Sequence, residues 1–334
     1  LIFKRALISF LMANLKCGLI GCGGRGRHWA RYLKKQSDVD MVASCDIDEL
    51  VLEKFNEKYS VPNAFNELDE MLDKHSDLDF VVICTPHFLH AKQTIATANK
   101  GIDIFCEKPM AISTKECDAM IKACKENDVK LNIGFQRRYH LNYLFAKKLL
   151  EEGRIGDVFH SNVQALWFRT EPYYLNSSPV PENEDEDWEG WRGHWKTEGG
   201  SALINQTIHI LDWFLALSGE LKDVQANVNI SMHEYIECED NVAATVTFKN
   251  GAVGLIQAGT SYKYNADELR FYGNKGTLNF TKKGISLDGK RLPFWEKLKF
   301  YNSVKGVRQD DIMRKFIDAV KNDTEVPVTG EEGR

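Results

Sequence analysis

Short runs of consecutive apolar residues alternate with helical patterns along the first part of the chain. Between residues 15 and 134, runs such as LKCGLI, DFVVICT and DIFCE are each followed by a stretch with the apolar spacing of a helix. Continuously apolar strands separated by helices are typical of a parallel sheet covered on both faces. Right-handed crossovers between such units give a doubly wound α/β fold. We therefore expect a first, doubly wound domain over residues 12–134.

The pattern changes after residue 135. A helix is predicted over residues 143–152, a second over 202–217 and a third over 311–321. The turn signals NG at 250–251 and GNKG at 273–276 separate runs typical of antiparallel strands. The sequence therefore predicts a second, α+β domain over residues 135–334, with an open, largely antiparallel sheet. Its expected strands cover residues 158–167, 224–230, 241–248, 253–260, 268–272 and 277–280.

Composition narrows the class of protein. A chain of 334 residues with a net charge of −5 and no basic block argues against a nucleic-acid or membrane-surface partner. The eight cysteines include no C-x-x-C pair, so we expect reduced, buried thiols in a cytoplasmic protein and no structural zinc. Residues 1–11 resemble a weak signal peptide, but Met12 is the expected start, because the first strand begins at Leu15.

Three glycines follow the first strand with the spacing Gly21-x-Gly23-x-x-Gly26. The first allows a tight turn, the second allows the backbone to approach a pyrophosphate, and the third allows the helix to pack on the strand. The N-terminus of that helix supplies N–H groups for the phosphates. The intervening residues Cys22, Gly24 and Arg25 are expected cofactor contacts as well.

An acidic residue after the second strand completes a dinucleotide-binding pattern. Asp46 lies 20 residues after Gly26, where a carboxylate accepts hydrogen bonds from the ribose 2′-hydroxyl. It would repel a 2′-phosphate, so NAD is favoured over NADP. Asp48 is the expected N-cap of the next helix.

Two further strands end in polar clusters at the same predicted sheet edge. The segment CTPHFLH places Thr85, Pro86, His87 and His90 where a dinucleotide would lie. The histidines suggest a metal, but no third ligand has matching spacing, so no metal is expected. The segment FCEKPM ends the next strand, and its lysine is suited to bind a hydroxyl oxygen or donate a proton.

A downstream helix carries the remaining candidate chemistry. In GGSALINQTIHILD, Asn205 and His209 are four residues apart and share one helix face, and Asp212 is three residues further on. Histidine titrates near neutrality, which suits proton exchange with a hydroxyl group. A buried, purely structural histidine is the alternative.

These three motifs together resemble the glucose–fructose oxidoreductase/inositol dehydrogenase (Gfo/Idh/MocA) family of NAD(P)-dependent oxidoreductases. The resemblance extends over nearly the whole chain from Met12 and implies a Rossmann domain followed by an α+β domain. It places Lys108 beside the nicotinamide and the substrate, Glu107 near the nicotinamide ribose, and His209 as acid/base. Many relatives have an aspartate where this chain has Asn205, which cannot act as a base.

The same resemblance suggests further substrate and cofactor contacts. It places Arg138 toward the active site and Gln136 near the nicotinamide. Trp191 and Arg192 are expected to stack on a sugar or bind its hydroxyl or carboxylate groups, and Asp212 is expected among the substrate contacts. A purely structural role for the tryptophan remains open.

The expected function is hydride transfer between a cyclic sugar, polyol or sugar-derivative hydroxyl and NAD. One alternative is a redox-neutral, NAD-dependent enzyme that cleaves glycosides. A second is a non-catalytic regulator that binds NAD and a sugar. A homodimer or homotetramer is expected from the resemblance.

Overall fold

The chain divides into two compact units. The computed structural model describes residues 14–175, 190–281, 284–304 and 306–334, and the expectations about residues 1–11 and Met12 lie outside these ranges. The first unit contains the residues up to Gly134 together with Ile312–Arg334, and the second contains Phe135–Asp311. The sequence-based division had assigned residues 312–334 to the second domain. They group with the first because helix α11 packs its aromatic side chain onto the first sheet, as described below.

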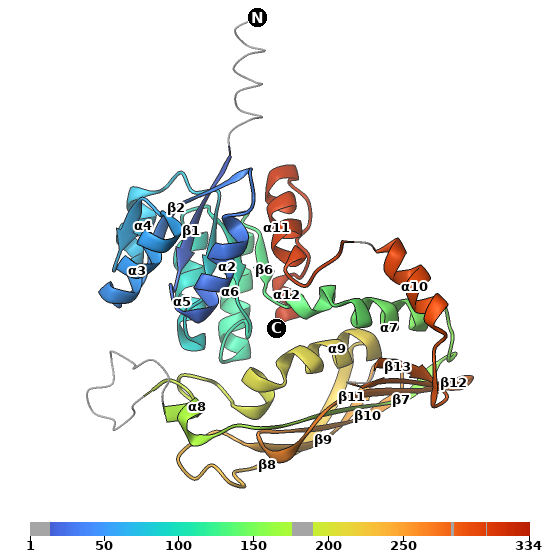
Figure 1. Cartoon of the computed structure of the whole chain (residues 1–334). Helices are drawn as coiled ribbons and strands as arrows, with labels where there is room; N and C mark the ends of the chain where they lie inside the picture. The colour runs from blue at the N-terminus through green and yellow to red at the C-terminus, as the bar shows by residue number, and fades with distance from the viewer. Residues whose placement is uncertain (1–13, 176–189, 282–283, 305) are drawn as a thin grey trace, which may run out of the picture. The chain divides into compact units, whose positions relative to one another are not determined.

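The first unit is built on a parallel six-stranded sheet with the order β3-β2-β1-β4-β5-β6. The order reverses direction between β1 and β4, so the carboxyl ends of these two strands flank a topological switch point. This arrangement confirms the doubly wound prediction (Figure 1). The elements are β1 (Leu15–Ile20), α2 (Gly24–Leu33), β2 (Val39–Cys45), α3 (Glu49–Tyr59), β3 (Asn63–Phe65), α4 (Leu68–Lys74), β4 (Phe80–Ile83), α5 (His87–Ala98), β5 (Asp103–Cys106), α6 (Thr114–Glu126), β6 (Leu131–Ile133), α11 (Asp311–Asn322) and α12 (Gly330–Gly333).

Helices cover both faces of this sheet. On one face, the ring of Phe105 contacts Trp29 of α2 at a centroid distance of 5.1 Å and Phe316 of α11 at 5.6 Å. The next residue of the strand, Cys106, points to the opposite face, where it lies beside Cys117 of α6. The two faces explain why β4 and the end of β5 are fully buried and continuously apolar.

The second unit is built on an eight-stranded sheet with the order β14-β13-β12-β11-β7-β10-β9-β8. Its neighbouring strands pair antiparallel except β7 and β10, which run parallel. The largely antiparallel sheet expected from the sequence is thus confirmed. The elements are η1 (Gln136–Tyr139), α7 (Leu141–Glu151), β7 (Val158–Phe168), α8 (Glu171–Leu175), η2 (Ala202–Gln206), α9 (Ile208–Ser218), β8 (Leu221–Asn229), β9 (Asn241–Phe248), β10 (Val253–Gly259), β11 (Ser261–Gly273), β12 (Gly276–Thr281), β13 (Gly284–Leu287), β14 (Lys290–Arg291) and α10 (Phe294–Ser303).

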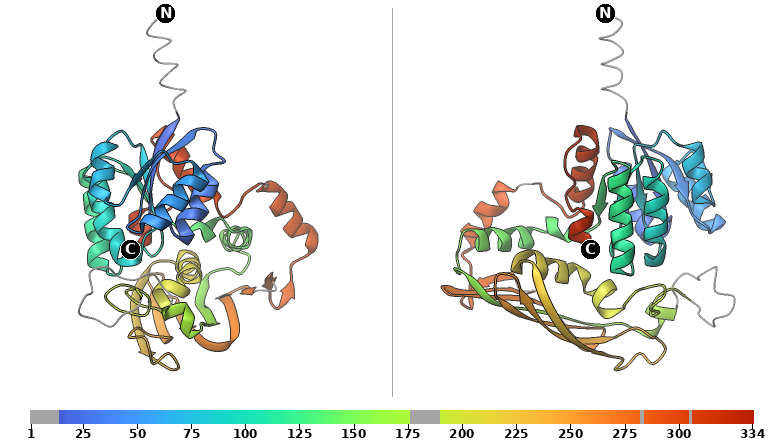
Figure 2. Two further views of the ribbon diagram at one scale, coloured as in Figure 1. Left: turned by 60° about the vertical axis from the view of Figure 1, so that its left-hand side comes forward. Right: turned by 180° about the vertical axis from the view of Figure 1, so that it is seen from behind.

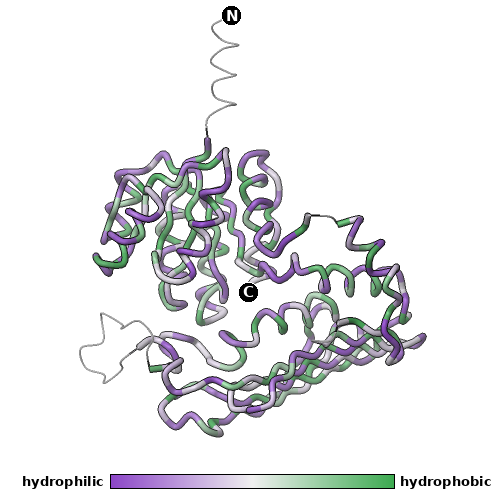
Figure 3. The backbone as a smooth tube through the Cα atoms, in the orientation of Figure 1, coloured by the Kyte–Doolittle hydropathy of each residue, from purple (hydrophilic) through white to green (hydrophobic). Residues whose placement is uncertain are grey.

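One face of the second sheet is covered by helices α7 and α9, and the other is open (Figure 2). The alternation along β9 shows why: Val242, Ala244 and Val246 are buried toward the helices, whereas Ala243 and Thr245 are exposed. The tube in Figure 3 accordingly alternates between hydrophobic and hydrophilic positions along these strands. A sheet with one solvated face is typical of antiparallel architecture.

The cysteines are free thiols, and seven of the eight are buried. Burial raises the pKa of Cys45 to about 12 and that of Cys117 to about 11, so both thiols are protonated at neutral pH. Within the described ranges, no helix combines the length and the apolar character needed to cross a bilayer.

Helix α11 should contribute strongly to the stability of the first unit. Phe316 is fully buried against Phe80, at a centroid distance of 5.5 Å, and against Phe105. We expect Phe316→Ala to lower the free energy of unfolding by about 3–5 kcal/mol, because it leaves a cavity in the core. Phe294→Ala, at a residue that is 78% exposed, is the matched control and should change it by less than about 1 kcal/mol. Equal losses in chemical denaturation would refute this packing role.

Candidate functional site

The glycine-rich turn between β1 and α2 is closely packed against the protein at Gly21 and Gly26 and has open space beside Gly23 and Gly24. Gly21 has φ +90°, and a side chain there would meet the backbone of Cys84 at 2.8 Å. A β-carbon on Gly26 would lie 2.0 Å from the carbonyl oxygen of Gly21, so only glycine allows α2 to pack against this turn. By contrast, a β-carbon on Gly23 or Gly24 would have no neighbouring atom within 4 Å. The turn therefore fits the approach of a phosphate to its backbone.

The N-terminus of α2 is suited to bind an anion. Its N-cap is Gly23, no described side chain caps it, and its first turn contains no acidic residue. Backbone N–H groups and the positive end of the helix dipole therefore point toward the space above the turn. The cradle and the helix N-terminus together fit a dinucleotide pyrophosphate.

Asp46 lies directly after β2 and is tied to the glycine turn. Its carboxylate accepts hydrogen bonds from the backbone N–H of Cys22 at 2.6 Å and from the backbone N–H of Asp48 at 3.0 Å. Asp48 has the expected N-cap role, since its side chain accepts from the N–H of Val51 at 3.0 Å. The two neighbouring acids therefore have separate functions, and Asp46 is the one at the phosphate turn.

Glu107 directly follows β5 and connects the end of this strand to helix α2, which follows the glycine turn. Its Oε1 accepts hydrogen bonds from Arg25 Nε and from Trp29 Nε1, both at 2.6 Å. Its Oε2 accepts from the backbone N–H of Lys108 at 3.2 Å. Glu107 is 4% exposed, so this buried carboxylate holds the first turns of helix α2 and the backbone of Lys108 together. Sequence reasoning had not included Trp29, although its place three residues after Gly26 sets it on the first turns of the same helix.

The polar cluster after β4 has a largely internal role. Both ring nitrogens of the fully buried His90 contact backbone carbonyls, Nδ1 that of Pro109 at 2.8 Å and Nε2 that of Thr85 at 2.9 Å. Burial lowers the pKa of this histidine, so a neutral ring donates to one of the two carbonyls. His90 thereby holds the ends of β4 and β5 in place. Pro86 is the N-cap of α5, and His87 is buried at its first position.

In the second unit, Arg138 and Asp212 form a bidentate ion pair. The guanidinium of Arg138 donates from Nη2 to Oδ1 at 2.7 Å and from Nε to Oδ1 and Oδ2 at 3.0 and 3.1 Å. Both side chains are largely buried. The pair joins η1 to α9, and Gln136, also buried, begins the same η1 turn.

His209 lies in the first turn of helix α9 and lines a cavity. It is 8% exposed, and its ring packs edge-on against Phe135 at a centroid distance of 6.2 Å. The cavity that it lines measures about 290 Å³ and also includes His140 and Trp213. Burial, followed by the charge of Arg137, lowers the pKa of His140, so this second imidazole is neutral near pH 7.

The segment before α9 is a π-helical turn, where a continuous helix over residues 202–217 was expected. Residues 202–206 form the turn η2, with the N–H of Gln206 donating to Ser201 and that of Thr207 donating to Ala202. The wider turn brings two consecutive side chains to one partner: Asn205 Nδ2, at 3.3 Å, and Gln206 Nε2 both donate to the hydroxyl oxygen of Tyr173. Consecutive residues of a regular α-helix would not share a face in this way. Such turns are frequent at functional sites.

Tyr173 of α8 is also stacked between cationic groups. The guanidinium of Arg192 lies 4.6 Å from its ring centroid and that of Arg169 lies 5.2 Å away. Arg192 also lies over the ring of Trp191 at 5.1 Å and donates to the carbonyl of Tyr173 at 3.1 Å. Arg169 donates to Gln206 Oε1 at 2.7 Å. The expected residues Trp191, Arg192 and Asn205 are therefore brought together by Tyr173, which sequence reasoning missed.

A buried carboxylate lies behind this cluster. Glu198 is 0% exposed, and its Oε2 accepts from the N–H of Gly193 at 2.6 Å while its Oε1 accepts from Asn205 Nδ2. Burial raises the pKa of Glu198 to about 7, against the opposing effects of these hydrogen bonds and of the positive charge of Arg192. Its position immediately before the glycine pair was the only signal for it in the sequence.

The expected residues thus form two groups. The glycine turn, Asp46, Glu107 and Lys108 belong to the first unit, while Asn205, His209 and their neighbours belong to the second. Among the residues that the structure describes, no cluster of three or more His, Cys, Asp or Glu side chains is arranged to hold a metal ion.

The fold and the phosphate cradle define an NAD-binding oxidoreductase domain followed by a mixed-sheet domain. Residues 15–135 match the oxidoreductase family with an NAD-binding Rossmann fold, and residues 143–279 match the GFO/IDH/MocA C-terminal domain. The chain belongs to the GFO/IDH/MocA family of oxidoreductases, as its motifs had suggested.

Relatives extend along nearly the whole chain. The myo-inositol 2-dehydrogenase of Thermotoga maritima is 27% identical, with 96% of this chain and 92% of the relative covered. The 2,7-anhydro-N-acetylneuraminate hydratase of Mediterraneibacter gnavus is 24% identical, with coverages of 80% and 67%. Among solved structures, the WlbA dehydrogenase of Bordetella pertussis in complex with NADH and UDP-GlcNAcA superposes with a TM-score of 0.83 at 26% identity, covering 96% of this chain and 92% of that one.

Asp46 should determine the choice between NAD and NADP. We expect Asp46→Ala to weaken NAD binding by about ten- to a hundredfold and to narrow the discrimination against NADP, because a carboxylate at this position would accept hydrogen bonds from the ribose and repel a 2′-phosphate. The dissociation constants of both cofactors, measured by calorimetry, test this.

Asp48→Ala is the matched control for that experiment. It removes the N-cap of α3 and should cost about 1 kcal/mol of stability while leaving the NAD/NADP preference unchanged. An unchanged preference in Asp46→Ala, or an equal change in both variants, would remove Asp46 from the cofactor site.

Proposed function

We propose that this protein is an NAD-dependent dehydrogenase that oxidises a hydroxyl-bearing carbon of a cyclic sugar, polyol or sugar derivative. The observation that carries the proposal is the phosphate cradle with Asp46, followed at the end of β5 by Lys108. The inositol and WlbA dehydrogenases among its relatives support a carbohydrate substrate.

Several residues of the first unit would hold NAD. The N–H groups at the start of α2 would bind the pyrophosphate, and Asp46 would accept hydrogen bonds from the adenosine ribose. When bound, NAD supplies the nicotinamide carbon that accepts a hydride. Thr85 would line the same edge of the sheet, with its hydroxyl oriented by Gln93 Oε1 at 2.6 Å. Glu107 would keep the loop and the lysine at fixed positions.

Lys108 and His209 would polarise the reacting hydroxyl group and accept its proton. An ammonium group polarises a hydroxyl oxygen, and a neutral imidazole nitrogen can accept its proton. Holding the reacting groups in near-attack geometry would contribute much of the remaining rate.

The polar cluster around Tyr173 would position the sugar ring. Asn205 and Arg192 would bind hydroxyl or carboxylate groups, and Trp191 would offer an apolar face for stacking. Arg138 would be held near His209 by its ion pair with Asp212, which lies three residues further along α9. The guanidinium groups are compatible with an acidic sugar derivative.

A second function is favoured by one observation. Two of the relatives are 2,7-anhydro-N-acetylneuraminate hydratases. A hydratase adds water to its substrate without net oxidation or reduction. A redox-neutral cycle that oxidises, eliminates, adds water and reduces would use the same residues. It differs in leaving no net NADH.

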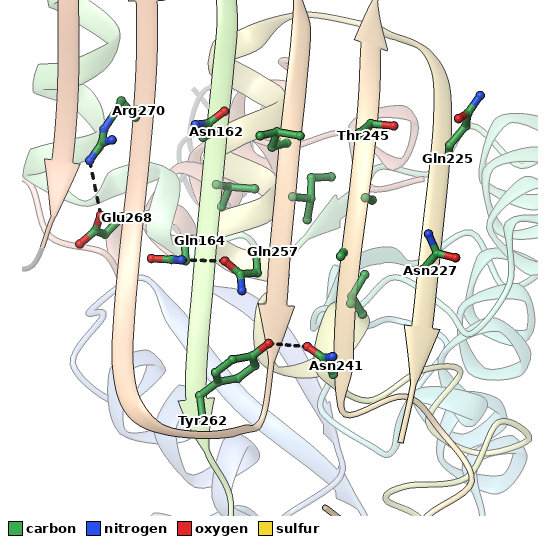
Figure 4. Close-up of a pocket in the computed structure, with 16 residues that line it drawn as sticks. Asn162, Gln164, Gln225, Asn227, Asn241, Thr245, Gln257, Tyr262, Glu268 and Arg270 are labelled. Atoms are coloured by element: carbon green, nitrogen blue, oxygen red, sulfur yellow. Dashed lines mark hydrogen bonds and ion pairs between the residues drawn. The ribbon is translucent and has the colours of Figure 1, made fainter. Parts of the chain in front are cut away.

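We also propose that copies of this chain associate through the open face of the second sheet, as a homodimer or homotetramer. A hollow of about 690 Å³ crosses this face, lined by polar and apolar side chains from several strands (Figure 4). Its hydrogen bonds include Gln164 Nε2 to Gln257 Oε1 at 2.7 Å, so parts of this polar surface are already ordered. Val253 and Leu255 are 48% and 44% exposed on the same face, which supports burial against another surface.

The proposed chemistry predicts that loss of a proton-transfer residue lowers turnover, and that in the His209 variant NAD binding changes little. Purified protein should produce NADH, measured by absorbance, with NAD and at least one member of a panel of sugars, inositols and sugar acids. Lys108→Ala or His209→Ala should lower kcat by about 10²–10⁴-fold, because each removes a proton-handling group. The dissociation constant for NAD should stay within about threefold in the His209 variant, since that residue lies in the other unit.

The outcomes distinguish the candidate functions. Near-normal turnover in either variant would remove that residue from the proposed chemistry. If the panel gives no NADH but the protein converts an anhydrosugar or glycoside with NAD present, the redox-neutral function replaces the dehydrogenase.

The proposed association can be tested with one charge. Leu255→Glu should reduce the mass of the assembly in light scattering toward that of a single chain, because a carboxylate would be buried in the contact. Leu50→Glu, at a leucine of α3 that is 66% exposed, is the control and should leave the mass unchanged. An unchanged mass in Leu255→Glu, or a monomeric wild type, would contradict the association through this face.

A further inference from the structure

We infer that Glu198 is a positioning residue that fixes the orientation of the Asn205 amide, and that the two residues act as one coupled donor–acceptor pair in the substrate site. The inference rests on the proposed function for the role of Asn205 toward a substrate. The pairing itself rests on contacts within the second unit.

The geometry defines which end of the amide faces the carboxylate. Glu198 Oε2 accepts from the N–H of Gly193 at 2.6 Å, and Oε1 accepts from Asn205 Nδ2. In its ionised form this carboxylate only accepts hydrogen bonds, which favours the arrangement seen here, with the amide nitrogen facing it. The other amide hydrogen is directed to the hydroxyl oxygen of Tyr173 at 3.3 Å. Both donors of Asn205 are thus committed to the protein.

This orientation decides what the amide offers a substrate. With Nδ2 held by Glu198 and Tyr173, the carbonyl oxygen lies on the opposite edge of the amide group. Under the proposed function, this edge of the amide would accept a hydrogen bond from a substrate hydroxyl group, whereas a carbonyl or carboxylate offers no donor to it. A group held in this way loses little entropy when the ligand binds.

Burial explains why the pair contains one carboxylate and one amide. Glu198 is 0% exposed, and the negative charge of Glu239 and the positive charge of Arg192 act on its pKa in opposite directions. A second carboxylate at position 205 would face the first across a hydrogen-bonding distance, and two such groups cannot both ionise. An amide at 205 satisfies the buried carboxylate without adding charge.

An exchange of the two chemical groups tests the inference. In Glu198→Gln, an amide NH₂ faces another donor, either Gly193 N–H or Asn205 Nδ2, and in Asn205→Asp two carboxylates face each other. We expect each single variant to lower kcat/KM for the sugar substrate by about tenfold or more. In the double variant Glu198→Gln/Asn205→Asp, the new glutamine NH₂ can donate to the new carboxylate, and its carbonyl can accept from Gly193. Its kcat/KM should recover to at least about tenfold above the product expected from the single effects.

Glu239 provides the matched control. It is also a buried glutamate, 5% exposed, and it holds the same π-helical turn, but through the backbone N–H groups of Ser201 and Leu203. Glu239→Gln tests loss of the turn's support without touching the amide. In the double variant Glu239→Gln/Asn205→Asp, kcat/KM should not recover, and the two single effects on kcat/KM should multiply.

Two readouts keep the outcomes distinct. The dissociation constant for NAD should stay within about twofold in all these variants, because the phosphate cradle and Asp46, which are proposed to hold NAD, lie in the first unit. Multiplicative single effects on kcat/KM in the Glu198/Asn205 double variant would overturn the positioning role. A wild type without any NAD-dependent turnover would overturn the proposed function and this role together. In that case the pairing is tested by the free energies of unfolding of the Glu198→Gln, Asn205→Asp and double variants. Additive losses in the double variant would refute it.

Discussion

The buried carboxylate of Glu107 is the contact on which the organisation of the first unit depends. It accepts hydrogen bonds from Arg25 and Trp29, both in the first turns of helix α2, and from the backbone of Lys108. A carboxylate that is 4% exposed is tolerated only when its oxygens are satisfied by donors, so its three partners are held as firmly as it is. One side chain thereby couples the phosphate turn to the strand end that carries the proposed acid/base.

The second unit uses the same physical device. Glu198 accepts from Gly193 and Asn205, and so connects the loop that carries Arg192 to the π-helical turn. In both units a buried acid fixes side chains that are proposed to act on small molecules. Rigid support of this kind is what places reacting groups within a fraction of an ångström of a productive geometry.

Much of the fold could be predicted because it follows from local pattern. Continuous apolar strands separated by helices give the parallel sheet, and alternating strands with NG and GNKG turns give the second sheet. The parallel pairing of β7 with β10 and the grouping of Ile312–Arg334 with the first unit could not be predicted in this way. Both depend on contacts between segments far apart in the sequence, such as Phe316 on Phe80.

The site was predictable where backbone conformation dictates residue type. Gly21 and Gly26 are required by a positive φ and by a close backbone contact, and the structure contains both constraints. Buried partners of the site residues left no comparable signal, because a glutamate before a glycine pair is equally compatible with an exposed loop. The π-helical turn was invisible for a similar reason, since its residues have the apolar spacing of an ordinary helix.

The asparagine at position 205 shows why such partners matter for interpreting a motif. Taken alone, an amide in place of a carboxylate suggests a lost proton acceptor. Here the pair still contains a carboxylate, that of Glu198, which is fully buried and accepts a hydrogen bond from the Asn205 amide. This hydrogen bond fixes the orientation of the amide. The carboxylate of Glu198 is then kept away from the substrate, but it still requires a hydrogen-bond donor, which Asn205 provides. Since a buried acid cannot exchange its proton directly with a ligand, proton transfer falls to Lys108 and His209 in the proposed chemistry, and the pair at 198 and 205 determines which hydroxyl is presented to them.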